Sequence, residues 1–154
     1  MQFNKTFNKS TILLGLIVLG GLNISQSFAT SKDLSSKDSK KLFKVLSNIG
    51  AVPVSSVDSE EIKVITVREV FCRSITFYKN TPHRKPVKQK YCDLVDSYSE
   101  KKLTASGGAA ELIFTSLKNT GIKEQFSRSK KKSTIGAHEI NCEFDDSYTC
   151  TVTE

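Results

Sequence analysis

Four cysteines are the residues of this 154-residue chain whose type and spacing most clearly point to chemistry. Cys72, Cys92, Cys142 and Cys150 could bind zinc as four thiolates or form two disulfides. Zinc sites of that kind use cysteines two to four residues apart, whereas here 19 and 7 residues separate the members of each successive pair. An even number of cysteines in a small chain is typical of an exported disulfide framework. The sequence therefore predicts two disulfides and no metal site.

The two histidines could support general acid–base chemistry. In a small basic exported protein, one imidazole can remove a proton and the other donate one while a lysine holds a phosphate, as a ribonuclease requires. However, His83 falls in a proline-containing loop and His138 begins a strand much further along the chain. No metalloprotease, serine-hydrolase or nucleotide-binding motif is found. We therefore expect a protein that is not an enzyme and has no cofactor, with a small secreted nuclease as the weakest alternative.

Positive charge is the clearest indication of binding. The chain has 23 Lys and Arg against 16 Asp and Glu, a formal net charge of +7. Residues 79–90 contain five of these cations and no acid, and residues 128–132 contain four. The candidate partner-binding residues are Lys79, His83, Arg84, Lys85, Lys88, Lys90, Arg128, Lys130, Lys131 and Lys132. The competing interpretation is that these are solvated loops without a partner.

We accordingly expect a small disulfide-stabilised binding protein that contacts an acidic protein through the hairpin loop 79–90, a protein inhibitor being one form of such an activity. The alternative is a protein that binds an envelope polyanion or nucleic acid, for which affinity would fall steeply with salt.

Residues 1–29 have the pattern of a secretory signal peptide. Lys5 and Lys9 precede an uncharged, largely apolar run, Thr11–Leu22, and Ser27 and Ala29 supply the small residues of a cleavage site. A helix needs roughly 20 apolar residues to cross a bilayer, so this run is short for the alternative of a membrane anchor. We expect cleavage after Ala29, export to the periplasm or the medium, and no stable membrane insertion afterwards.

Two parts of the chain resemble each other. Leu42–Gly50 and Ile113–Gly121 share the pattern aliphatic-Phe-x-x-Leu-x-Asn-x-Gly at an offset of 71 residues, and Glu69–Cys72 matches Glu139–Cys142 at an offset of 70. Matches in the same order at nearly the same offset indicate a tandem duplication. The predicted organisation is repeat unit 1 at 30–96, a linker at 97–108 and repeat unit 2 at 109–154. If each unit closes its own bridge, the disulfides are Cys72–Cys92 and Cys142–Cys150.

Each predicted unit is a helix followed by a β-hairpin. The helices are expected from Ser35 or Ser36 to Gly50 and from Ala109 to Gly121, because apolar residues recur there at helical spacing and a glycine follows. Segments rich in β-branched and aromatic residues predict the strands 62–67, 73–78, 87–95, 138–144 and 147–153. The expected fold is α+β: a duplicated helix-plus-hairpin unit with an antiparallel sheet, two disulfides within units and one shared core.

Overall fold

The computed structural model describes residues 30–154, so the predicted signal peptide at 1–29 lies outside the described residues. The described chain forms an α+β fold with one antiparallel sheet, as predicted from the sequence. Its elements are β1 (Ser31–Asp33), α2 (Ser36–Asn48), β2 (Val54–Ser55), β3 (Lys63–Phe77), β4 (Val87–Asp96), β5 (Lys102–Ser106), α3 (Gly107–Asn119), β6 (Gln125–Ser127), β7 (Lys132–Phe144) and β8 (Tyr148–Thr153). No helix among residues 30–154 is long and apolar enough to cross a membrane.

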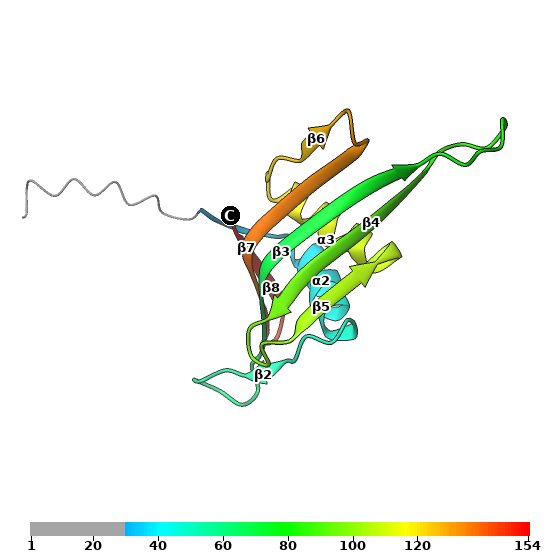
Figure 1. Ribbon diagram of the computed structural model, residues 1–154. Coiled ribbons are helices and arrows are strands. Elements are labelled where there is room, and N and C mark those ends of the chain that lie inside the picture. Colours follow the sequence, from blue (N-terminus) through cyan, green and yellow to red (C-terminus); the bar gives the residue numbers. More distant parts are fainter. Residues whose placement is uncertain (1–29) are drawn as a thin grey trace, which may run out of the picture.

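The sheet has the strand order β1-β8-β7-β3-β4-β5, with β2 added to β3 and β6 added to β7. The two helices lie on the same face of this sheet and contact each other (Figure 1). The short strand β1 pairs with the last strand, β8, and β5 pairs with β4. Residues 97–108, the expected linker, therefore contain a strand, β5, that forms one edge of the sheet.

The first helix forms where the sequence predicts it. Ser35 is its N-cap and accepts a hydrogen bond of 3.2 Å from the backbone N–H of Asp38, whose carboxylate lies in the first turn, where the helix dipole favours it. Leu42 and Leu46 face the core and are fully buried. Gly50 follows the helix with a φ of 109°, a left-handed conformation that glycine adopts at little cost. The second helix starts at Gly107, two residues earlier than expected.

The long strand β3 differs from the sequence prediction. Segments 62–67 and 73–78 were expected to be separate strands, but the structure joins them into one strand of 15 residues. The pairing of β3 with β4 shifts between Arg68 and Phe71, and Glu69 between them has a φ of 52°. This bulge changes which residues of β3 face the core, because the buried positions pass from Val67 to Val70 rather than continuing by twos. The interrupted alternation made one strand look like two.

Both predicted disulfides are present. Cys72–Cys92 joins β3 to β4, Cys142–Cys150 joins β7 to β8, and no free cysteine remains among residues 30–154, which excludes the zinc alternative. All four sulfurs belong to one hydrophobic core that also includes buried residues of both helices. The disulfides thus lie in the core between the sheet and the helices, where they cross-link the central strands to their outer neighbours.

Candidate functional site

The structure brings the two basic segments together at one end of the sheet. The β6–β7 turn, residues 128–131, lies beside the end of β3, where the backbone N–H of Thr76 donates a hydrogen bond of 3.3 Å to the carbonyl of Lys131. The ammonium of Lys131 lies 3.8 Å from the centre of the Tyr78 ring, a cation–π contact. We call residues 77–90 together with 128–132 the basic end.

Strands β3 and β4 project beyond their neighbours at this end. The pairing of β7 with β3 stops at Ile75, and the pairing of β5 with β4 stops at Tyr91. The pairing of β3 with β4 continues to Phe77 and Val87, so the last residues form a two-stranded ribbon, which Figure 1 shows extending away from the sheet. A narrow ribbon closed by a loop can reach into a concave partner in a way that a flat sheet cannot.

The loop 78–86 carries four of the predicted binding residues at the tip of the ribbon. The backbone N–H of Arg84 donates to the carbonyl of Thr81 at 3.3 Å, which closes a turn containing a proline, and proline is favoured at the second position of such a turn. All the side chains of this loop are exposed. The predicted binding residues in it are Lys79, His83, Arg84 and Lys85, and Arg128 and Lys130 are exposed in the neighbouring turn.

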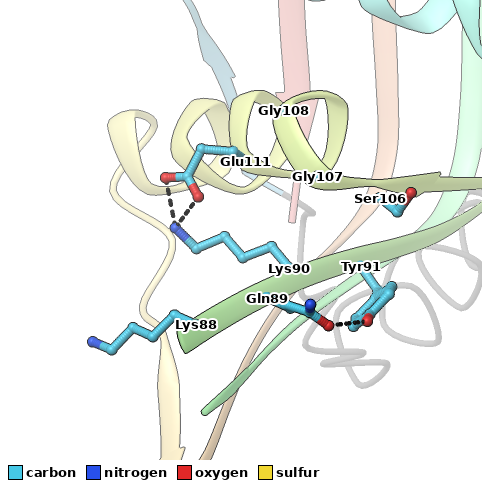
Figure 2. Close-up of a pocket in the computed structure, with 8 residues that line it drawn as sticks. All are labelled: Lys88, Gln89, Lys90, Tyr91, Ser106, Gly107, Gly108 and Glu111. Carbon is cyan, nitrogen blue, oxygen red and sulfur yellow. Dashed lines mark hydrogen bonds and ion pairs between the residues drawn. The ribbon is translucent and has the colours of Figure 1, made fainter. Parts of the chain in front are cut away.

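The remaining predicted residues of the segment 79–90 are Lys88 and Lys90. They lie on strand β4 rather than in a loop, because β4 begins at Val87. Figure 2 shows the hollow of about 510 Å³ that they share with the first turn of α3. The ammonium of Lys90 is 2.6 Å from the carboxylate of Glu111 and 4.8 Å from the centre of the Phe114 ring, and its side chain is 19% exposed. Lys88 extends away from Glu111 in the same view. These two contacts hold the ammonium of Lys90 in one position.

A smaller pocket of about 230 Å³ lies next to this hollow, between the sheet, α3 and β6. The pairing of β4, β3 and β7 puts its floor residues in two rows across three strands. The first row is Lys90, Ser74 and Ser133, and the second is Lys88, Thr76 and Lys131. The buried Cys72–Cys92 disulfide lies on the same face of the sheet, next to the first row. The hydrophobic core therefore ends here, and hydroxyl and ammonium groups follow it along the strands. We call this pocket the cradle.

The wall of the cradle carries one carboxylate among the lysines. Glu124, just before β6, lies with its Oε2 atom 3.1 Å from the ammonium of Lys118 on α3. A hydrogen bond from Ser133, with the hydrogen bond and positive charge of Lys118, lowers the pKa of Glu124 below its ordinary value of 4.5, although partial burial acts in the opposite direction. The charge of Lys90 contributes in the same sense as Lys118. Glu124 is therefore ionised at neutral pH, and the cradle surrounds it with cations.

Sequence reasoning found the lysines at 88, 90 and 131 but missed the floor hydroxyls, Lys118 and Glu124. One signal was present: the inward-facing positions of β3 change from Val70 and Cys72 to Ser74 and Thr76. A strand that becomes polar on its core face before it ends leaves a polar surface where the packing stops. Only the pairing with β4 and β7 shows which charges lie beside these hydroxyls.

The two histidines lie in different places. His83 is exposed in the tip loop, whereas His138 is exposed in β7, level with the bulge of β3. About eight residues of strand lie between that level and Phe77, or roughly 27 Å at the usual rise per residue. They do not form a pair of catalytic groups in this arrangement.

Acidic side chains lie at the opposite end of the sheet. Residues 58–61 include three acids and precede Lys63, the first residue of β3. Lys63 pairs with Phe144, which is followed by Asp145 and Asp146. The long strand β3 thus runs from acidic loops to basic loops, and the molecule carries a separation of charge along the sheet.

Comparisons of the chain with protein-family models, with curated proteins and with solved structures give no significant match. The function is therefore inferred from the geometry and charge of the chain itself.

Proposed function

We propose that the protein is a small exported binding protein that uses the basic end to contact an acidic protein partner. The observation that carries this proposal is the convergence of two basic segments, distant in sequence, on a projecting ribbon. A cluster of cations at one end, with acids at the other, orients an incoming acidic surface and accelerates its encounter with the ribbon.

Exposed apolar side chains favour a protein partner over a simple polyanion. Phe77 and Tyr78 are 45% and 58% exposed at the base of the tip loop, Val87 is 37% exposed opposite them, and Phe126 is 67% exposed on β6. Aromatic residues are enriched at the centre of protein interfaces, whereas lysines belong to the polar rim around it. An inhibitor would use this arrangement by inserting the ribbon into the acidic cleft of an enzyme, where the aromatic side chains would lose contact with water.

Export forms part of the same proposal. Two buried disulfides are stable in an oxidising compartment, and residues 1–29 have the pattern of a signal peptide. A mature protein in the periplasm or the medium would meet its partner there.

We also propose that the fold arose by tandem duplication of a unit with one helix and one disulfide-bonded hairpin. Both halves have the order strand, helix, short strand, long strand, strand. The sulfur of Cys92 lies 3.6 Å from the carbonyl oxygen of Ala110, and the sulfur of Cys150 lies 3.4 Å from that of Ser39. Ser39 and Ala110 are 71 residues apart, the same offset as the matching helix sequences. On this proposal, the long tip loop is a difference between the copies, and we assign the binding function to it.

The test compares three forms of the mature protein as bait for proteins of the native envelope and medium. The tip variant carries Lys79→Glu, Arg84→Glu and Lys85→Glu. The control variant carries Lys37→Glu, Lys40→Glu and Lys44→Glu, three exposed residues of α2, so that its net charge is the same. We expect quantitative mass spectrometry to find a protein captured by the wild type and the control but not by the tip variant. Equal capture by all three forms, or equal loss from both variants, would contradict the proposal.

A second pair of variants separates a protein partner from an envelope polyanion or nucleic acid. Phe77→Ala with Tyr78→Ala leaves the charge unchanged, and Val57→Ala with Tyr98→Ala removes exposed apolar groups elsewhere. Binding to a protein should weaken about tenfold or more with the first pair and stay the same with the second. Insensitivity to both pairs, together with a steep decrease in affinity with salt, would favour the polyanion instead.

A further inference from the structure

We propose that the cradle is a binding site for a phosphate group, either as inorganic phosphate or as the end of a phosphate ester. The site shares Lys88, Lys90 and Lys131 with the basic end but is distinct from the tip loop, and it does not depend on the proposed protein partner. Three features of the cradle support phosphate binding: its charge, its hydrogen-bond donors and the left-handed backbone conformation of one lysine.

The charge of the cradle suits a dianion. Lys88, Lys90, Lys118 and Lys131 line it, and Glu124 is the one carboxylate among the lining residues. Lys90 also pairs with a glutamate of α3 outside the cradle. When both carboxylates are counted, two positive charges remain, which match a phosphate dianion better than a singly charged carboxylate.

The donors of the cradle also favour phosphate. Ser74 and Ser133 are 7% and 6% exposed on the floor, and Thr76 lies in the next row. Because the Ser133 hydroxyl is hydrogen-bonded to Glu124, the hydroxyl donors left for a ligand are those of Ser74 and Thr76. Hydroxyl groups can donate to phosphate oxygens beside ammonium groups, which bind phosphate as point charges. No arginine lines the cradle among residues 30–154, so an anion there would be bound by ammonium and hydroxyl groups and not by a guanidinium fork, which binds carboxylate and phosphate alike.

Lys131 occupies a backbone position that does not favour a lysine. Its φ is 45°, in the left-handed region that glycine and asparagine adopt more easily. Residues held in such conformations cluster at functional sites. Here the conformation places the Lys131 ammonium over the Tyr78 ring at the edge of the cradle. A side chain with a role in ligand binding explains why a lysine is found where a glycine would be easier to accommodate.

The size of the cradle limits the ligand. About 230 Å³ admits a phosphate with a small substituent but is smaller than the usual pocket for a drug-sized molecule. Phe126 at the rim offers an exposed apolar face to the substituent of an ester. We therefore infer that the phosphate binds inside and that any larger part of the ligand lies outside.

The test is titration of the mature protein with inorganic phosphate and with glycerol 1-phosphate at constant ionic strength, with acetate and glycerol as references. Binding is followed by calorimetry and by the amide NMR shifts of Ser74 and Ser133. We expect saturable binding of at least one phosphate compound and shifts at the cradle floor. Tighter binding of the free ion or of the ester identifies the source of the phosphate. Absence of saturable binding by either compound, or equal binding of acetate, would overturn the proposal.

Variants localise the site. Lys131→Gly removes the ammonium while keeping the left-handed turn, and Lys88→Gln removes a second charge. Each is expected to raise the Kd for phosphate about tenfold or more. The control, Lys79→Gln with Lys85→Gln, removes two charges from the tip loop and should change the Kd less than about threefold. If the control weakens binding as much as the cradle variants, the effect is one of general charge and the cradle is not the site. The tip variant used for partner capture leaves the cradle intact, so failure of one proposal is distinguishable from failure of the other.

Discussion

The backbone N–H of Cys150 donates a hydrogen bond of 2.9 Å to the buried hydroxyl of Ser39, which ties the first helix to the last strand. Strand β1 ends at Asp33, just before the level of Cys150, so the serine hydroxyl supplies the acceptor that a longer strand would have provided. At the matching place on α3 the residue is Ala110, and there β5 continues alongside Cys92. The hydroxyl is thus present on α2, beside strand β1, which ends before it can pair with Cys150. It is absent from α3, beside strand β5, which does pair with Cys92.

We predict that Ser39→Ala destabilises the protein by about 1–3 kcal/mol, because it leaves a buried backbone N–H without an acceptor. Urea unfolding of the mature protein measures this. The exposed Ser36→Ala on the same helix is the control and should change the free energy of unfolding by less than about 0.5 kcal/mol. Equal stability of the Ser39→Ala variant and the wild type would show that water replaces the hydroxyl.

The disulfides should contribute much of the stability of this small domain. They close loops with sequence separations of 20 and 8 residues, which correspond to about 3.3 and 2.5 kcal/mol in the chain-entropy model. We therefore expect Cys72→Ala with Cys92→Ala to lower the free energy of unfolding slightly more than Cys142→Ala with Cys150→Ala. Denaturant titrations of the two double variants test this, and a titration of the reduced wild type that matched the oxidised one would contradict it.

The helices and the disulfide pairing could be predicted because their signals are local or repeated. The stripe containing Leu42 and Leu46, the cap at Ser35 and the glycine at 50 lie within one short segment. The strands were harder. The bulge at Glu69 interrupts the alternation of β3, and β5, with the sequence Lys102–Ser106, is short and half exposed, so it resembles a linker.

The cradle could not be predicted from the sequence, because it depends on the register of three strands. Ser74 lies beside Lys90 on one side and Ser133 on the other, and these residues are 16 and 59 positions away in the chain. A shift of one residue in either pairing would turn the lysine or the serine to the other face of the sheet. Such a site is fixed by non-local pairing and not by any motif.

Two glycines after the helices should differ in their tolerance of a side chain. Gly50 and Gly121 both have left-handed φ angles, 109° and 87°, so alanine at either place should cost about 1 kcal/mol or more. A Cβ at Gly50 would also lie 3.3 Å from the buried side chain of Leu103, whereas at Gly121 it would lie 3.1 Å from Nζ, the far end of the long Lys32 side chain. We expect Gly50→Ala to be the more destabilising of the two in thermal unfolding.

The control for this comparison is Gly108→Ala in the first turn of α3, where nothing lies within 4 Å of the new Cβ. It should leave the melting temperature unchanged or raise it slightly, since alanine is the better helix former. A larger loss from Gly121→Ala than from Gly50→Ala would show that the contact with Leu103 adjusts easily.

The carboxylate of Glu124 should make stability depend on pH in the acidic range. Its pKa in the folded protein is lowered by the hydrogen bond from Ser133 and by Lys118, so its ionised form stabilises the fold above the unfolded pKa of about 4.5. That contribution is lost as the pH falls through the lower folded pKa. We expect Glu124→Gln to be less stable than the wild type at pH 7 and equally stable near pH 2. Urea unfolding at the two pH values measures this, with the exposed Glu61→Gln as control. A difference between the Glu124→Gln variant and the wild type that persisted near pH 2 would mean that Glu124 stabilises the β6 region by its shape and not by its charge.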